Sequence, residues 1–219
     1  VFEIGGAACV GWTVTFRQVV EMTSEDRPSR FTDMASTNFE SADGALFRFV
    51  IERRNDGAPA EKVEGRAERK DGKIEVELKS PKPASTTLPP VALFPTEHTK
   101  RLIEAAKAGQ TVVEAPVYDG SDGGEKLYDT LAVIGQPVEG DDPKATEAPV
   151  PDVPEGKGRR WPTKLSYYKK GESGDQNPVY TLNFDMFENG ISANLLLDYG
   201  HLKLRGEMKR LEILKPSSC

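Results

Sequence analysis

The sequence predicts a mainly β protein: a strongly curved, antiparallel sheet of many strands, with one principal helix at about residues 96–109 packed in or over its concave side. Apolar residues alternate with polar ones in several short runs, which is the period of a half-buried strand. Turns rich in Asn, Asp and Gly follow many of these runs. Only one segment has clear helical spacing.

The first alternating run extends from Trp12 to Met22. The same period of two recurs in three later segments. Their apolar members are Phe47, Phe49 and Ile51, then Ile74, Val76 and Leu78, then Tyr180, Leu182, Phe184 and Met186. Antiparallel strands of this kind bury one face and expose the other. We therefore expect Thr181, Asn183 and Asp185, on the polar side of the last run, to face water.

Short turns and a bend punctuate the predicted strands. Residues 55–57, 71–72 and 188–190 are predicted to turn tightly, because Asn, Asp and Gly accept the positive φ that such turns require. After Met208 the apolar phase shifts, which predicts a bulge or sharp bend around Lys209 and Arg210. Long strands with bends are typical of strongly curved sheets.

The predicted helix has recognisable ends. Thr96 is a candidate N-cap, and Gly109 is placed to end the helix. Leu102, Ile103 and Ala106 fall on one face between them. One helix among about a dozen strands favours a plug or lid on a curved sheet over an α/β layer.

The chain length suits a single domain covering residues 1–219. Residues 139–158 are rich in Pro, Gly and acidic residues, and are interpreted as a loop. They are not interpreted as a domain boundary, because the strands on either side are too few to close a core alone. Since the sequence starts without methionine, we expect a signal peptide, and further sequence with it, upstream of Val1.

Charge and hydropathy narrow the range of partners. The net charge is −6, and residues of both signs are interleaved along the predicted strands. This distribution gives no concentrated positive field for phosphates, so nucleic acid is not an expected partner. No apolar run approaches the roughly 18 residues that a membrane-spanning helix needs, so the chain is not predicted to span a membrane.

The two cysteines, Cys9 and Cys219, allow one intramolecular disulfide, and their pairing is the simpler interpretation. Pairing would indicate an oxidising compartment. The alternative is two unrelated free thiols in a cytosolic protein. Neither cysteine lies in a CxxC motif or near a histidine in sequence, which disfavours a redox motif or a zinc site.

Catalytic chemistry has few candidate residues. A serine nucleophile needs a histidine base, and only His98 and His201 are available. Residues 120–123 lack the spacing of a nucleophile elbow. His98 falls in the first turn of the predicted helix and His201 in a predicted strand, and structural or surface roles are expected for both. We assign no catalytic, cofactor-binding or metal-ligating residue and do not predict an enzyme.

The run from Asp119 to Glu125 combines closely spaced carboxylates with glycines. Such residues can ring a calcium ion, although the spacing and length differ from an EF-hand. The alternative is a glycine-rich turn in which the aspartates form Asx-turns. We favour the turn and leave the ion as an alternative.

Several motifs together resemble one family. They are the runs 93–98, 102–106, 117–122 and 129–135, together with one early cysteine and one at the end of the chain. In these features the chain resembles, over nearly its whole length, the periplasmic envelope integrity protein B family of alphaproteobacteria. Members of that family usually carry more sequence before the first cysteine.

The resemblance implies an open, barrel-like β-spiral with a helix in its cup, and a stabilising disulfide between Cys9 and Cys219. It also implies a periplasmic protein without known enzymatic activity or cofactor. Its expected role is to maintain the cell envelope under stress, in association with a periplasmic tetratricopeptide-repeat protein.

Other functions remain open at this point. A concave face lined by apolar residues suits a carrier or sensor of a lipid or of a lipoprotein acyl chain. A hydrolase or calcium enzyme that uses residues 119–125 is the third alternative, and it lacks a pair of nucleophile and base.

Overall fold

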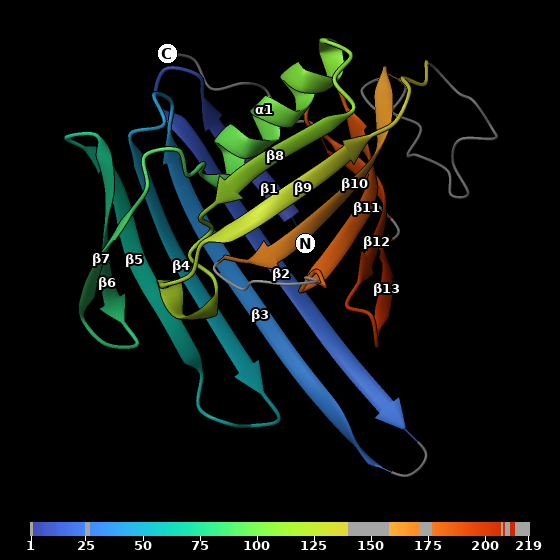
Figure 1. The fold of residues 1–219 in the computed structure, drawn as a ribbon. Coiled ribbons are helices and arrows are strands. Elements are labelled where there is room, and N and C mark those ends of the chain that lie inside the picture. Colours follow the sequence, from blue (N-terminus) through green and yellow to red (C-terminus); the bar gives the residue numbers. More distant parts are fainter. Residues whose placement is uncertain are drawn as a thin grey trace. The chain divides into compact units, whose positions relative to one another are not determined.

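The computed structural model describes residues 2–24, 27–139, 158–170, 177–206, 208 and 211–212. Within these ranges the chain forms thirteen strands, one α-helix and one short 3-10 helix (Figure 1). The strands make two antiparallel sheets, one of seven strands and one of six. The predicted mainly β class with one principal helix is therefore confirmed.

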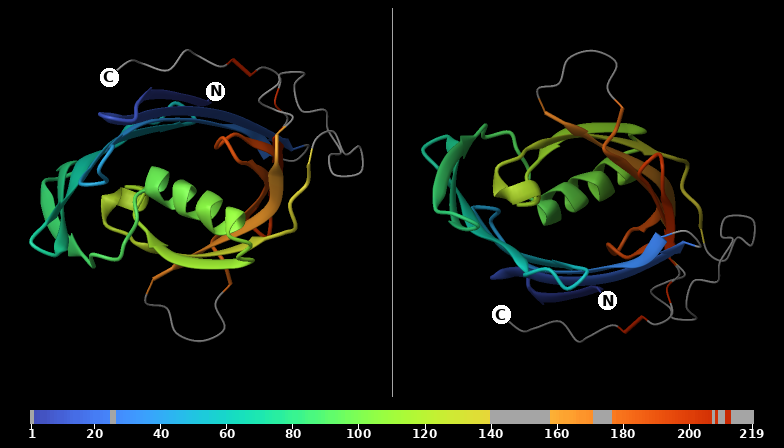
Figure 2. Two further views of the ribbon diagram at one scale, coloured as in Figure 1. Left: turned by 90° about the horizontal axis from the view of Figure 1, so that it is seen from above. Right: turned by 90° about the horizontal axis from the view of Figure 1, so that it is seen from below.

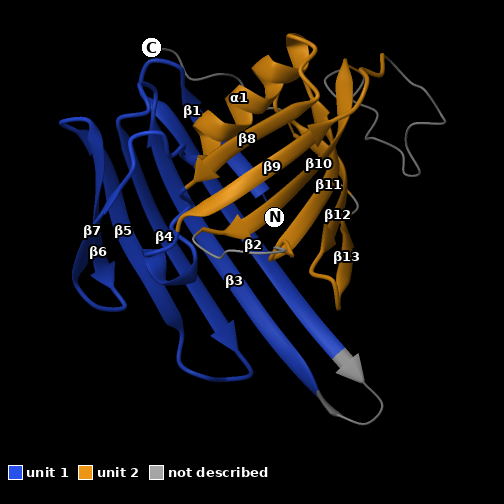
Figure 3. Ribbon diagram, viewed as in Figure 1, with its two compact units in different colours: residues 1–94, 118–126, 214–219 blue, residues 95–117, 127–213 orange. Residues whose placement is uncertain are grey.

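The described residues divide into two compact units (Figure 3). The first contains the described residues of 1–94 and 118–126, and the second those of 95–117 and 127–213. Each unit is described by itself, and the single domain expected from the sequence stays a prediction. Most of the predicted loop, residues 140–157, and the predicted bend at Lys209 and Arg210 lie outside the described residues.

The seven-stranded sheet of the first unit keeps the order of the chain from β1 to β7. Its strands are β1 (Phe2–Ala7), β2 (Gly11–Ser24), β3 (Arg27–Ser41), β4 (Leu46–Asn55), β5 (Glu61–Lys70), β6 (Lys73–Ser80) and β7 (Ala84–Leu88). Asp71 and Gly72, with φ of 51° and 75°, form the predicted two-residue turn between β5 and β6. The predicted turn at residues 55–57 opens the longer connection from β4 to β5, again with positive φ at Asp56 and Gly57.

The predicted alternation is present in the first sheet. In β2, Thr13, Thr15 and Arg17 are exposed, whereas Trp12 and Val14 on the opposite face are half-buried. The alternate apolar residues of β4 and β6 are more deeply placed. Phe47, Phe49, Ile74 and Val76 are each at most 1% exposed.

The second unit contains α1 (Pro95–Lys107), β8 (Val112–Val117), β9 (Tyr128–Ile134), β10 (Arg160–Lys169), β11 (Tyr180–Phe187), β12 (Ser192–Asp198) and β13 (Lys203–Gly206). Its six strands lie in the order β13-β12-β11-β10-β9-β8. The predicted turn at residues 188–190 joins β11 to β12, and the N–H of Gly190 donates to the carbonyl of Phe187 over 3.0 Å.

Helix α1 begins at Pro95, one residue before the predicted start, so the prediction of Thr96 as N-cap was wrong. Proline is suited to the first helical position because its missing N–H would have no partner there. The predicted end is confirmed: Gly109 has φ of 76°, and the N–H groups of Gly109 and Gln110 donate to the carbonyls of Ala106 and Ala105. Among the described residues no helix is long and apolar enough to cross a membrane.

One apolar face of α1 packs on the six-stranded sheet. Leu102, Ala105 and Ala106 form a buried cluster with residues of β8 to β11. The sheet members of that cluster are Val113, Ala132, Ile134, Trp161, Leu165, Phe184 and Met186. Figure 2 shows this sheet curving around the helix, so the expected packing of the helix on a concave side is confirmed.

Strand β11 departs from the expected half-wet pattern. Thr181 and Asp185, which were expected to face water, are 7% and 6% exposed, and Asn183 is half-buried. Their polar atoms have partners: the hydroxyls of Thr181 and Ser166 lie 3.1 Å apart, and the carboxylate of Asp185 accepts from the Asn194 amide over 2.7 Å. Alternation of polar and apolar residues therefore does not show that the polar face is exposed, because polar side chains can be buried when they are hydrogen-bonded to each other.

Candidate functional site

The candidate site is the inner face of the seven-stranded sheet, defined as the face that carries Ile4, Val14 and Phe49. The strand register places these residues in one cross-strand row that continues through Gly65 to Leu78. Residues directly opposite each other in an antiparallel ladder lie on the same face. Residues of six strands therefore share one surface, and most of those in this row are apolar.

Aromatic side chains cover the part of the inner face at β4. Phe94 stacks on Phe47 with ring centroids 5.2 Å apart, and Tyr118 meets Phe49 edge to face at 5.8 Å. All four rings are at most 1% exposed. Aromatic pairs of this geometry stabilise a core beyond the apolar area that they bury.

Arg69 fastens the segment that supplies Phe94. Its guanidinium donates to the carbonyls of Gly44, Pro90 and Ala92 over 2.8 to 3.0 Å. The same group lies 4.9 Å from the centre of the Phe94 ring, within range of a cation–π contact. Arg69 thus ties a connection after β7 to the turn before β4.

The glycine-rich insert, residues 118–126, covers the adjoining part of the inner face. The Tyr118 hydroxyl donates to the carbonyl of Gly124 over 2.7 Å, and burial raises the pKa of Tyr118. A Cβ added at Gly120 would lie 2.5 Å from the Phe49 ring, and one added at Gly124 would lie 2.6 Å from Leu78. These glycines are needed because the backbone approaches the sheet so closely.

The carboxylates of the insert serve its own turn. Asp119 accepts from the backbone N–H of Ser121 over 2.9 Å, which is the Asx-turn that the sequence analysis favoured. Burial raises the pKa of Asp119. Asp122 pairs with Lys126 over 2.9 Å. In the described part of the chain, no three His, Cys, Asp or Glu side chains come together as a metal site.

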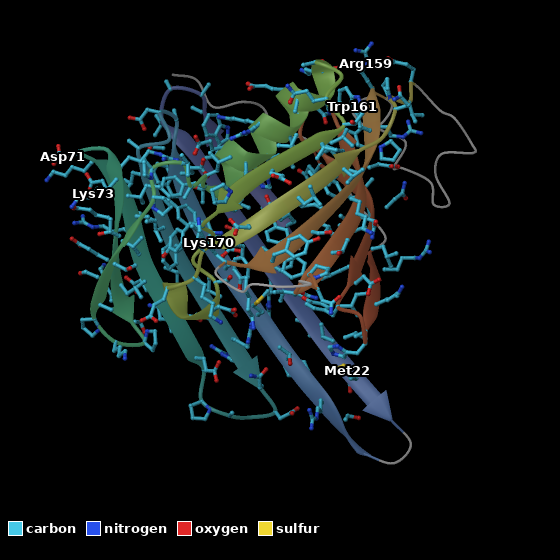
Figure 4. All side chains as sticks on the ribbon, in the orientation of Figure 1. Met22, Asp71, Lys73, Arg159, Trp161 and Lys170 are labelled. Carbon is cyan, nitrogen blue, oxygen red and sulfur yellow. The ribbon has the colours of Figure 1, made fainter. Side chains whose placement is uncertain are left out.

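The remaining part of the inner face, at β1 and β2, is more open. Its apolar side chains form what we call the apolar strip: Phe2, Ile4, Trp12, Val14, Phe16, Val20 and Met22. Phe2, Ile4 and Met22 are 61%, 51% and 43% exposed. The other members are half-buried. Figure 4 places Met22 toward the far end of β2.

Basic residues follow the strip at that end of the inner face. Arg30 of β3 stands directly opposite Met22, and Arg53 of β4 stands opposite Met34. Both arginines are exposed. The inner face therefore passes from an apolar surface to a positively charged end.

The outer face of the same sheet has a different chemistry. It carries exposed cross-strand ion pairs, such as Arg17 with Asp33 at 2.8 Å and Arg66 with Glu77 at 3.0 Å. The Arg17 guanidinium lowers the pKa of Asp33. Exposed pairs of this kind add little stability. The same face also carries exposed Val19 and Phe31.

The cysteines and histidines named from the sequence do not converge on the inner face. Cys9 lies in the turn between β1 and β2, and Cys219 lies outside the described residues, so their pairing stays a prediction. His201 is exposed between β12 and β13, not within a strand as expected. His98 of α1 is only 3% exposed.

His98 is held neutral by its surroundings. The Thr130 hydroxyl donates to the carbonyl of Ala115 over 2.8 Å, and its oxygen lies 3.3 Å from Nε2 of His98. Since the hydroxyl proton is already donated, Nε2–H of His98 is the donor in that contact. Burial, and to a lesser extent the charge of Arg101, lowers the pKa of His98 to about 4. This arrangement serves the packing of α1.

Comparison with known proteins gives the family. The chain matches the EipB-like family over residues 1–215. This chain belongs to the EipB-like family. The resemblance noted in the sequence is thereby confirmed.

The EipB-like chain is similar to the cell envelope integrity protein EipB of Brucella abortus (strain 2308). The two are 35% identical over 215 residues, which is 97% of this chain and 74% of the relative. The fold is similar to the crystal structure of a beta-barrel-like protein of domain of unknown function DUF1849 from Brucella abortus. The TM-score is 0.85 and the identity 34%, covering 98% of this chain and 86% of that chain.

Sequence reasoning on this EipB-like chain missed the apolar strip as a site. The alternation of β2 was a usable signal, and it was interpreted only as a buried strand face. The insert of residues 118–126, which comes from far along the chain, approaches Phe49 of β4 and Leu78 of β6. How much of the inner face it covers cannot be seen in the sequence of β2.

Replacing Gly120 with alanine tests the close approach of the insert. The new methyl group would collide with Phe49, so Gly120→Ala is expected to lower the free energy of unfolding by about 2 kcal/mol or more. The matched control is Gly123→Ala, which has a similar positive φ but nothing within 4 Å of the added atom. Urea unfolding measures both. Equal losses would mean that backbone strain, and not contact with Phe49, explains the effect.

The lowered pKa of His98 predicts that the stability of the protein depends on pH. The folded state takes up this proton near pH 4, whereas the unfolded chain takes it up near pH 6.5, so stability falls as the pH drops through this window. The loss from His98 between pH 6.5 and 5 is on the order of 2 kcal/mol. His98→Gln should remove this part of the slope in urea unfolding. His201→Gln, at an exposed site, should keep it. An unchanged slope in His98→Gln would refute the assignment.

Proposed function

We propose that this chain is a non-enzymatic periplasmic protein that maintains the integrity of the cell envelope, acting through contact with a periplasmic tetratricopeptide-repeat protein. The observation that carries the proposal is similarity along 97% of the chain to a protein named for cell envelope integrity. Similarity to a solved relative, with a TM-score of 0.85, supports the same fold.

A scaffold of two antiparallel sheets suits an interaction protein. It presents an outer face with paired charges and an inner face whose apolar residues are partly open. Helical-repeat proteins carry extended concave surfaces for binding other proteins. A sheet face or edge of this chain is a suitable counterpart for such a surface.

The functional test uses a strain of the native host that lacks this protein. It should become sensitive to detergent, and expression of the protein should restore resistance. Cross-linking in the complemented strain, followed by purification and mass spectrometry, should enrich a tetratricopeptide-repeat protein over the control made with Cys9→Ser. Normal detergent resistance of the deletion strain would contradict the proposed role in the envelope. Restored resistance without enrichment of a tetratricopeptide-repeat protein would contradict only the proposed partner.

We also propose that Cys9 and Cys219 form a disulfide and that residues 1–219 act as one domain. Among the described residues no cysteine is free. Cys9 lies in an exposed turn, where a bond to a distant segment needs no rearrangement of a core. In the chain-entropy model a loop of this length contributes roughly 5 kcal/mol, less any strain in the folded state.

The disulfide is tested by counting thiols in protein isolated without reductant. Denatured wild-type protein should react with no maleimide, whereas Cys9→Ser should expose one reactive thiol. The variant should also unfold at lower urea concentration, with a loss of about 2 to 4 kcal/mol. Two reactive thiols per wild-type chain would contradict both the pairing and the proposed oxidising compartment.

The apolar strip favours a second function, that of a carrier or sensor of a lipid or of a lipoprotein acyl chain on the concave inner face. Phe2 and Ile4 are large apolar side chains left substantially exposed beside Phe16 and Val14, and Met22 is exposed further along β2. Exposed apolar surface with a polar border is typical of a binding site. Saturable binding of a neutral long-chain alcohol tests this second function.

A further inference from the structure

We propose that the apolar strip binds one long-chain fatty acid, with its alkyl chain along β2 and its carboxylate at Arg30. This inference deepens the carrier function proposed above and rests on it. It names the chemical class of the ligand, its orientation and the residue that recognises its charge.

The strip has the length and width of a single alkyl chain. From Val14 to Met22 it follows eight residue steps, or about 26 Å at the usual rise of a strand, enough for an extended palmitate chain. Phe2 and Ile4 widen it at one end, because they lie opposite Phe16 and Val14. Polar Gln18 interrupts the row.

The neighbouring strand limits the strip on its other side. Where β3 runs beside β2 on the inner face, it presents mainly polar side chains: Thr32, Ser36, Asn38 and Glu40, with Met34 between them. The open apolar surface is therefore one to two strands wide. A stable protein interface needs a broader apolar centre, so a linear ligand fits the strip better than a second protein surface.

The exposed charge of the inner face fixes the orientation. At the end of the row where Trp12 lies, Glu40 opposite it is buried. Arg30 lies opposite Met22 at the other end and is exposed. A guanidinium binds a carboxylate through two parallel hydrogen bonds.

Arg30 is a better candidate than Arg53 for this role. Arg53 has a carboxylate neighbour on the inner face, because Glu61 stands directly opposite it across β4 and β5. Arg30 lies on β3 directly beside Met22, where an alkyl chain along β2 would end. The alkyl tail then lies toward Trp12.

The experiment titrates the full chain with palmitate below its micellar concentration, using calorimetry, and repeats it with hexadecanol. Palmitate should bind saturably, and hexadecanol about tenfold more weakly. Arg30→Gln should weaken the binding of palmitate by about tenfold and leave the binding of hexadecanol unchanged. The control is Arg48→Gln, an exposed arginine in β4 opposite Phe39 on the outer face. It should bind as the wild type does.

Neighbouring valines on opposite faces of β2 test the path of the alkyl chain. Val20→Asn should weaken both ligands several-fold, whereas Val19→Asn, at an exposed outer position, should weaken neither. Unchanged palmitate binding in Val20→Asn would place the ligand elsewhere and overturn the proposal.

The outcomes separate the two levels of the proposal. If hexadecanol binds as tightly as palmitate and Arg30→Gln has no effect, the carrier function stands and the fatty-acid assignment fails. If neither ligand binds, both fail. If neither binds and the protein forms a dimer that Val20→Asn dissociates, the strip is an interface between copies of the chain.

Discussion

The structure of the first unit depends on covering the apolar inner face of its seven-stranded sheet. Phe47 and Phe49 are the deepest side chains of β4, and they are covered by Phe94 and by the insert of residues 118–126. Contact this close is possible because Gly120 has no side chain to keep its backbone away from the Phe49 ring. The open strip at β1 and β2 is the part of the same face that the insert does not reach.

Much of the fold is predictable because alternation is a direct consequence of strand geometry. Phe47 and Phe49, or Ile74 and Val76, point to one side whatever surrounds them. The sequence is less informative about what meets the other side. In β11 the polar residues Thr181 and Asp185 are buried because Ser166 and Asn194 satisfy their oxygens. Such pairing joins residues of different strands, so no single segment of sequence reveals it.

The candidate site was less predictable than the fold. Its side chains come from β1 and β2, whose alternation is easily seen, but alternation does not show how much of the face is left exposed. The start of α1 shows the same limit on a smaller scale, since both Pro95 and Thr96 are favourable near a helix start and only the structure selects Pro95. The family was identifiable because runs of residues, and not their contacts, define it.

The insert also sets an order in which the molecule can be made. It belongs to the first unit, although β8 and β9 on either side of it belong to the second. During synthesis the first seven strands emerge before all of their cover. Phe94, which stacks on Phe47, follows soon after β7, whereas Tyr118 and Gly120, which cover Phe49, come later. Residues 1–94 alone therefore lack part of the first unit. A nascent chain that stops after residue 94 would expose apolar surface of β4 to β6, and such surface makes incomplete chains prone to aggregation.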